Sequence, residues 1–452
     1  MRILHFSADD IAGGAAKAAY RLNAALREAG HDSRMVVLRK KSDDPRVIQA
    51  PPPAPRAWAS RFERARQHVP GLRQSLPTAN YTFNFDSPPQ VNVEALLSDE
   101  TLRPEIICLH WINGLLDVRA IRQLHDHFRC PIVWVMADQE PMTGGCHYAF
   151  GCEGFKHECG NCPQLSPSQA NDHSCLVWQR KKELLAELPI CFVAPTSWGR
   201  EKLRQSSLFR HHRCELIPYP IDPLTFRPFD QRVARDLLHL PQGKKIIFFG
   251  ATYLEDRRKG MPLLLEALTE TRERLKTPTD DVFLLVAGLN GNQLMPKLPF
   301  AGKYVGQLND DLTLALAYQS ADLFVCPSVE EAGPMMIPEA MMCGTPVVAF
   351  HTGGAPDLIE SGKTGYLAHL ADSTDLAGGI LRFLEADNGS TIRGLAHLAA
   401  SKKHSPNLVA DLYSRLFHSL KGRTDCEGAA RSKERGDGTT VADSAPILLE
   451  PI

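Results

Sequence analysis

The sequence predicts an α/β protein with two doubly wound domains, each built around a parallel sheet, that face each other across a cleft. Three observations lead to this prediction. Short apolar segments alternate with helix-like segments along most of the chain, the apolar segments are continuous, and the series restarts after the proline-rich stretch 218–228. Continuous apolar segments are typical of strands that are buried on both faces of a parallel sheet. One larger sheet is the alternative that this pattern leaves open.

The first series occupies residues 1–220. Ile3–Phe6 is its first apolar segment, and Gly13 and Gly14 then open a helical pattern that ends at Gly30. The strands expected after it are Met35–Leu38, Ile106–Leu109, Ile132–Met136, Ile190–Ala194 and Glu215–Ile217.

The second series occupies residues 221–403 and follows a connection stiffened by four prolines. It alternates in the same way as the first, which predicts a second domain of the same class. Its segments are, in order, Ile246–Phe249, Met261–Leu275, Val282–Ala287, Leu323–Cys326, Glu339–Cys343, Pro346–Phe350 and Pro356–Glu360.

The composition excludes several classes of protein. The chain has 452 residues, of which 43% are hydrophobic and 23% charged, as in ordinary globular proteins. Lysine and arginine total 51 against 52 acidic residues, so the basic excess of a nucleic-acid-binding protein is absent. The apolar start is too short for a signal peptide, and no stretch approaches the ~20 apolar residues of a membrane span. We therefore expect a cytoplasmic protein.

Segment 56–73 carries five arginines against one acid, Glu63. Its apolar residues, Trp58 and Phe62 among them, recur at helical spacing. Two interpretations are open: a helix that contacts anionic lipid at the inner face of the cell membrane, and an amphipathic helix that docks on its own domain.

Two glutamates flank the start of a predicted helix in the second domain. The apolar strand that ends at Cys326 is followed by a loop rich in glycine and proline, and a helix is expected to begin near Pro334 or Pro338. Seven residues separate Glu331 in the loop from Glu339 in the first turn. The free N–H groups of such a turn attract anions, and an acid there can bind a ribose diol or simply favour the helix start.

This segment resembles the signature of family 4 retaining glycosyltransferases, which use nucleotide sugars and have the GT-B architecture of two Rossmann-like domains. Further similarities cover about residues 1–420. They include the pair Gly13-Gly14, the segment Ala194–Trp198, the connection Ile217–Asp222, the basic segment Arg257–Leu268 and the closing glycines 353, 354, 362 and 365.

The resemblance implies a hexosyltransferase that needs no metal for catalysis. Basic side chains would neutralise the leaving diphosphate. The acceptor hydroxyl would attack the anomeric carbon on the front face, and the departing phosphate oxygen would take its proton. The donor would be UDP-, GDP- or ADP-linked. The family usually has an arginine where this chain has Ala251, so that role either passes to Arg257 or Arg258 or is absent. The residues expected to bind the donor are Gly14, Arg257, Arg258, Lys259, Gly333, Met335 and Glu339.

The resemblance also implies a last helix over 404–421 that crosses back to the first domain. The polar, charge-rich residues 422–452 are expected to form a disordered tail.

The first domain is similar to a subgroup that acts in exopolysaccharide and O-antigen synthesis, where the acceptor is a saccharide or lipid-linked saccharide. Many relatives have a histidine before Asp138, but this chain has Ala137. Two alternatives are open: His110, His147 or Asp138 replaces that histidine, or the site is altered. The residues expected to act in catalysis are Glu331, Asp138 and His110, with a buried structural histidine as the alternative for His110.

Four cysteines cluster in the loop 144–165 with spacings of five, six and two residues. The last two cysteines, with two residues between them, have the spacing of a zinc knuckle, so we expect a structural zinc site. Disulfides or free thiols are the alternatives. The expected ligands are Cys146, Cys152, Cys159 and Cys162.

Two other functions stay open. One is a nucleotide-sugar epimerase or a phosphorylase of the same fold, and the other is a zinc-stabilised binding protein without catalysis. A dehydrogenase is disfavoured because no Gly-x-Gly-x-x-Gly motif follows the first strand.

Overall fold

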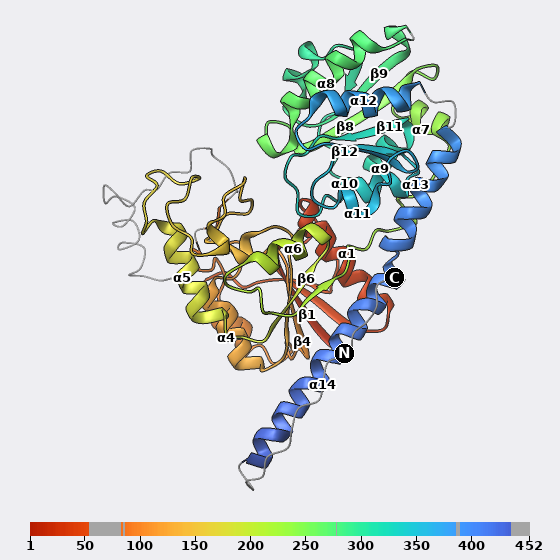
Figure 1. Cartoon of the computed structure of the whole chain (residues 1–452). Helices are drawn as coiled ribbons and strands as arrows, with labels where there is room; N and C mark the ends of the chain where they lie inside the picture. The colour runs from red at the N-terminus through yellow and green to blue at the C-terminus, as the bar shows by residue number, and fades with distance from the viewer. Residues whose placement is uncertain (54–82, 85, 277, 386–388, 435–452) are drawn as a thin grey trace.

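Two parallel sheets form the frame of the molecule and lie one above the other in Figure 1. A computed structural model of the chain describes residues 1–53, 83–84, 86–276, 278–385 and 389–434, with side chains up to 422. The first sheet has seven strands in the order β3-β2-β1-β4-β5-β6-β7, and the second has six in the order β10-β9-β8-β11-β12-β13. This confirms the predicted pair of doubly wound sheets and excludes one larger sheet.

All neighbouring strands run parallel within each sheet. The strands of the first sheet are β1 (Arg2–Asp9), β2 (Asp32–Arg39), β3 (Val47–Gln49), β4 (Ile106–Leu109), β5 (Ile132–Val135), β6 (Ile190–Ala194) and β7 (Cys214–Leu216). Those of the second are β8 (Lys245–Tyr253), β9 (Val282–Leu289), β10 (Gly302–Tyr304), β11 (Leu323–Cys326), β12 (Val347–Phe350) and β13 (Gly365–Ala368).

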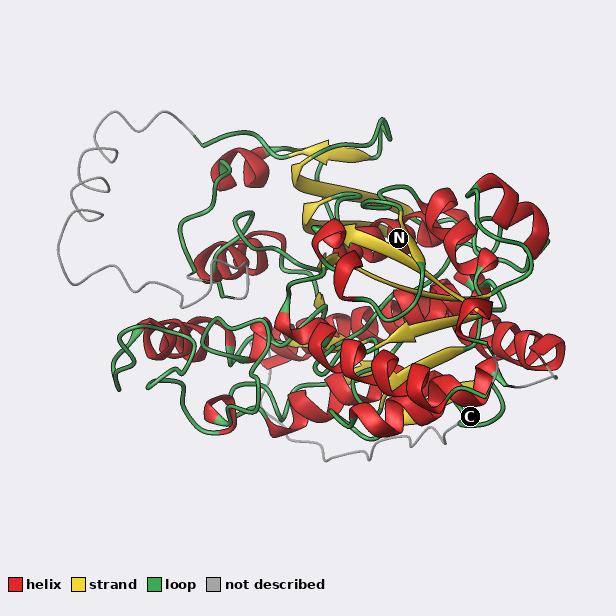
Figure 2. Ribbon diagram, turned by 90° about the horizontal axis from the view of Figure 1, so that it is seen from above, coloured by secondary structure: helices red, strands yellow, loops and turns green. Residues whose placement is uncertain are grey.

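Helices surround the strands when the molecule is viewed from above (Figure 2). The first domain contains α1 (Gly14–Glu28), α3 (Val93–Ser98), α4 (Val118–Phe128), α5 (His173–Leu185) and α6 (Ser197–Gln205). The second contains α7 (Gln231–Leu237), α8 (Met261–Arg274), α9 (Asp311–Ser320), α10 (Met336–Met342), α11 (Ala355–Leu358), α12 (Ser373–Leu384) and α13 (Gly389–His404), and α14 (Pro406–Glu434) follows.

The burial of the strands explains their composition. Every residue of β4, β5, β11 and β12 is buried, because helices cover both faces of these central strands. One buried apolar cluster continues from α1 through the connection at Ile217 and Tyr219 into β8 and α10. The two domains therefore share part of their core.

Helix α14 crosses from the second domain to the first and runs along it in Figure 1. His31 Nε2 lies 2.7 Å from Ser414 Oγ, and Arg213 Nη1 donates to Ser419 Oγ at 2.9 Å. The helix continues to Glu434, so residues 422–434, which we expected to begin a disordered tail, are helical. Alanine, arginine, lysine and glutamate propagate a helix that is already formed, even without an apolar face.

Segment 56–73, with its two open interpretations, lies outside the described residues. None of the helices within the described ranges is long and apolar enough to cross a membrane.

Candidate functional site

A cavity of about 320 Å³ lies between the domains, where the carboxyl ends of β1, β5, β8 and β11 meet. Open α/β sheets bind their ligands at this end of the strands. The lining residues used below are Gly14, Trp111, Ala137, Asp138, His147, Tyr148, Arg258, Lys259, Glu331, Gly333 and Met335.

The basic wall of the cavity comes from the short helix η3 (Arg257–Lys259) that follows β8. Gly260 ends it with φ of +65°, and a Cβ at this position would lie 1.9 Å from the carbonyl oxygen of Pro327. Only glycine therefore allows the basic turn to pack this closely against the end of β11.

Glu331 lies at the centre of the basic wall and is 7% exposed. Its Oε2 accepts from Lys259 Nζ at 2.5 Å and from Arg258 Nη1 at 3.5 Å, and its Oε1 accepts from the Tyr148 hydroxyl at 3.2 Å. Burial alone would raise the pKa of Glu331, but the positive charges of Lys259 and Arg258 outweigh it and hold the pKa below its ordinary value. Glu331 is therefore a carboxylate at neutral pH.

The loop after β5 packs onto the same basic helix. The Tyr148 ring lies 4.0 Å from the Arg258 guanidinium, and the Phe150 ring lies 3.4 Å from that of Arg257. The backbone N–H of Phe150 also donates to Glu330 Oε2 at 2.9 Å. These contacts with the first domain hold Arg258 at the wall of the cavity and Arg257 outside the cavity.

Glu339 lies in the first turn of α10 and is 3% exposed. Its Oε1 accepts a hydrogen bond of 2.8 Å from Arg21 Nη1, on α1 of the first domain. Arg21 Nη2 donates to Asp311 Oδ2 at 2.7 Å, and Lys17 Nζ donates to Asp311 Oδ1 at the same distance. Burial raises the pKa of Glu339 in spite of Arg21. This cluster of four charged side chains joins α1 to α9 and α10.

A histidine–carboxylate pair lines the opposite wall. Asp138 Oδ2 lies 2.6 Å from His147 Nδ1, while Asp138 Oδ1 accepts from the backbone N–H of Glu140 at 2.8 Å. Burial alone would lower the pKa of His147, but the charge of Asp138 outweighs it and raises the pKa above its ordinary value.

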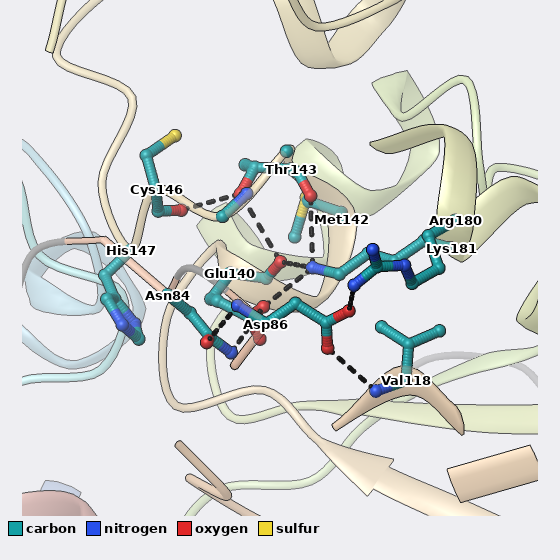
Figure 3. Close-up of polar contacts among 12 residues, drawn as sticks. Asn84, Asp86, Val118, Glu140, Met142, Thr143, Cys146, His147, Arg180 and Lys181 are labelled. Carbon is teal, nitrogen blue, oxygen red and sulfur yellow. Dashed lines mark hydrogen bonds and ion pairs between the residues drawn. The ribbon is translucent and has the colours of Figure 1, made fainter. Parts of the chain in front are cut away.

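A buried ion pair supports the turn that carries His147 (Figure 3). Lys181 on α5, 1% exposed, donates to Glu140 Oε1 at 2.7 Å and to the backbone oxygen of Thr143 at 3.1 Å. Asn84 Nδ2 donates to the same Glu140 oxygen at 3.2 Å. The turn is therefore held by charge-assisted bonds from two distant segments.

Residues 243–386 match the family model for group 1 glycosyl transferases. The putative colanic acid biosynthesis glycosyl transferase WcaC of Escherichia coli is 25% identical over 383 residues, which are 80% of this chain and 87% of that protein. The chain is a glycosyltransferase, and its residues 243–386 are similar to group 1 of these enzymes. The phosphatidyl-myo-inositol mannosyltransferase of Mycobacterium leprae is 30% identical over 184 residues, and there the match spans 39% of this chain and 47% of the relative.

Solved structures share the architecture of this glycosyltransferase. Sucrose-phosphate synthase of Thermosynechococcus elongatus is 20% identical, with a TM-score of 0.65 over 94% of this chain and all of that one. Anabaena HepE in complex with UDP-glucose is 17% identical, with a TM-score of 0.61 over 93% of this chain and all of that one. The fold is GT-B.

Most of the predicted site residues of the glycosyltransferase meet at the cavity. They are Gly14, Asp138, Arg258, Lys259, Glu331, Gly333 and Met335.

Three predicted site residues lie elsewhere. His110 is 5% exposed and pairs with His5 at 2.8 Å, and burial lowers its pKa to about 3, so it is a neutral histidine inside the first domain. This position does not fit a catalytic role and agrees with the structural alternative. Arg257 is exposed beside Phe150, and Glu339 is buried against Arg21.

The four clustered cysteines line one small cavity of about 20 Å³ in the first domain. Within the described residues, no group of three or more His, Cys, Asp or Glu side chains is arranged to hold a metal ion, and the cysteines are free thiols. Burial raises the pKa of Cys159 to about 12, so without a metal this thiol stays protonated. Zinc binding stays a prediction.

Sequence reasoning missed two residues of the site. Arg21 and Tyr148 contact Glu339 and Glu331 from the first domain. Arg21 stands among small apolar residues on the helix that follows the glycine pair, which was a usable signal. Tyr148 had none, because nothing in the sequence around it indicates that it contacts Glu331.

Proposed function

We propose that this glycosyltransferase moves a hexose from a nucleotide sugar to an acceptor hydroxyl with retention of configuration. The observation that carries the proposal is the position of Lys259 Nζ, 2.5 Å from Glu331 Oε2 at the wall of the interdomain cavity. A cation and a carboxylate at the mouth of parallel strands suit a substrate that has both a diphosphate and sugar hydroxyls.

In the proposed reaction, the bond from the anomeric carbon to the diphosphate oxygen breaks and a bond to the acceptor oxygen forms on the same face. The acceptor proton passes to the departing phosphate oxygen. Lys259 and Arg258 stabilise the negative charge that develops there. Glu331 orients the sugar hydroxyls and is not the nucleophile, because Lys259 and Arg258 hold it as a paired carboxylate.

Glu339 is proposed to bind the ribose diol. Arg21 donates to its Oε1 and the Tyr318 hydroxyl lies 3.5 Å from its Oε2, so a ribose that binds Glu339 must share these oxygens with them or displace them. Closure of the domains around the donor would then exclude water from the sugar.

For the donor we favour UDP-linked sugars, since the structure of Anabaena HepE contains UDP-glucose. The 25% identity to a protein named for colanic acid biosynthesis supports a role in polysaccharide synthesis, with a saccharide or lipid-linked saccharide as acceptor.

A screen of UDP-, GDP- and ADP-sugars for release of the free nucleoside diphosphate tests this proposal. The enzyme is expected to release diphosphate from one donor class, and Lys259→Ala to abolish the release. Binding of a nucleotide sugar without any release, with and without saccharide acceptors, would instead favour a binding protein that has lost catalysis.

A further inference from the structure

Phe150, on the loop after β5, contacts one basic and one acidic residue of the second domain. The centre of its ring lies 3.4 Å from the guanidinium carbon of Arg257, and its backbone N–H donates to Glu330 Oε2 at 2.9 Å. These two residues directly precede Arg258 and Glu331, which line the interdomain cavity. Phe150 is not among the described residues that line this cavity, so it acts on a ligand there only through its neighbours.

The backbone of Phe150 adopts a conformation that is rare for a bulky residue. Its φ is +49°, in the left-handed region that suits glycine. Such a conformation persists only where the surrounding structure enforces it, and it is typical of functional sites. A phenylalanine at this position therefore indicates that its ring, which lies against Arg257, has a role beyond folding.

Arg257 and Arg258 belong to one short turn, the helix η3, so a contact with one of them also restrains the other. Asp256 caps this turn: its Oδ1 accepts from the backbone N–H of Arg258 at 3.0 Å, and its Oδ2 accepts from Arg258 Nη2 at 2.7 Å. The backbone N–H of Val329 donates to the carbonyl oxygen of Arg258 at 2.8 Å, which joins the turn to the loop that carries Glu331. A ring that fixes Arg257 from outside the cavity consequently limits where the Arg258 guanidinium lies.

The loop that carries Phe150 is itself anchored on the first domain. Lys181 on α5, which is buried, donates to Glu140 Oε1 at 2.7 Å near the start of this loop (Figure 3). Tyr148, two residues before Phe150, has its ring centre 4.0 Å from the guanidinium carbon of Arg258. One anchored segment of the first domain thus contacts both arginines of the basic turn.

We propose that Phe150 is a positioning residue: through Arg257, it holds the basic turn η3 in the place where the diphosphate of the donor binds. The inference rests on the proposed function, which assigns the diphosphate to Lys259 and Arg258. It adds that the first domain raises the affinity for a nucleoside diphosphate by contacting the outer side of this turn. The affinity then depends on an aromatic ring that the ligand does not touch.

Calorimetric titration tests the inference. The wild-type protein is titrated with UDP, GDP and ADP, and the nucleotide that binds most tightly is used for the variants. Phe150→Gly removes the ring, keeps the backbone N–H and suits the positive φ, so it should fold. Its affinity should fall about threefold to tenfold, as expected for the loss of one partly exposed cation–π contact. Phe150→Tyr keeps an aromatic ring and should recover most of this loss.

A double-mutant cycle with Arg257→Ala separates positioning from a general loss of structure. If Phe150 acts through Arg257, then Phe150→Gly changes the affinity of the Arg257→Ala protein by less than about twofold. A damaged fold would instead lower the affinity in both backgrounds. Arg129→Gly is the matched control, because Arg129 has a φ of +48° at the end of α4 and is absent from the described lining of the cavity. This variant should keep the wild-type affinity.

Unchanged affinity in folded Phe150→Gly, or an equal loss in the Arg257→Ala background, overturns the inference and leaves the proposed function standing. If Phe150→Gly does not fold, Phe150→Asn takes its place, since asparagine also tolerates the left-handed region. Unchanged affinity in that variant overturns the inference as well. A wild-type protein that binds none of the three nucleotides overturns the proposed function, and the inference with it.

Discussion

Arg21 Nη1 donates a hydrogen bond of 2.8 Å to Glu339 Oε1, joining two domains through residues that are 318 positions apart. Both side chains are nearly buried, with 9% and 4% of their area exposed. The acid that the proposed function assigns to the ribose is therefore held by the opposite domain in this structure. A ligand that binds Glu339 Oε1 must displace Arg21 or share this oxygen with it, so the proposed donor binding depends on the arrangement of the domains.

We predict that Arg21→Ala lowers the free energy of unfolding by about 3 kcal/mol, because it leaves the carboxylates of Glu339 and Asp311 without their shared partner. Urea denaturation measures this. Arg122→Ala, which breaks an ion pair with 44% and 54% of its side chains exposed, is the control and should change stability by less than about 0.5 kcal/mol. Equal effects of the two variants would contradict the role given to Arg21.

The ion pairs of Glu331 should make the free energy of unfolding depend on pH. Because the folded protein holds its pKa below the ordinary value, its ion pairs contribute stability that is complete above about pH 4.3, the ordinary glutamate pKa. That contribution is lost as the pH falls through the lower pKa of the folded state. Between about pH 6 and pH 3, the wild type should therefore lose more unfolding free energy than Glu331→Gln. Parallel losses in denaturation curves would show that Glu331 is not held as a carboxylate.

Gly260 is predicted to be irreplaceable. Alanine there combines a positive φ with a Cβ placed 1.9 Å from the carbonyl oxygen of Pro327, so the basic turn must move. Gly260→Ala should lower the free energy of unfolding by at least about 2 kcal/mol and weaken nucleotide binding. Gly378→Ala, inside α12 with open space around its Cβ, should be neutral or stabilise by up to about 1 kcal/mol. A Gly260→Ala protein with unchanged stability would refute this packing.

We predict that the cluster of four cysteines binds a metal ion. Four cysteines that line one small cavity would close around zinc as thiolates, and protein purified under reducing conditions should contain about one zinc ion per chain. Elemental analysis measures this. Cys162→Ser should lower the zinc content, whereas Cys214→Ser, outside the cluster, should not. Protein without zinc after expression with the metal supplied would contradict the prediction and leave the four cysteines as free thiols.

The central strands could be predicted because both sheets bury them on both faces, as in β5 and β11, which makes them continuous apolar segments. The edge strands β3, β10 and β13 were not predicted. The meeting of Lys259 with Glu331 could be predicted for a related reason. Both follow strands of one parallel sheet, so their loops lie at the same edge.

Contacts between the domains could not be predicted in this way. The partner of Glu339 is set by how α1 lies against α10. The packing of Tyr148 on Arg258 depends on the conformation of a loop, which side chains from distant segments, Lys181 among them, hold in place. His110 could not be assigned either, since its sequence neighbourhood does not reveal that it faces His5 rather than the cavity.

The central claim is that the basic turn at Lys259 binds a nucleoside diphosphate. Calorimetric titration of the wild-type protein and Lys259→Ala with UDP, GDP and ADP tests it most directly. One nucleotide should bind the wild type, and its affinity should fall about tenfold or more in folded Lys259→Ala. Equal affinities for the two proteins, or a wild type that binds none of the three, would contradict the account.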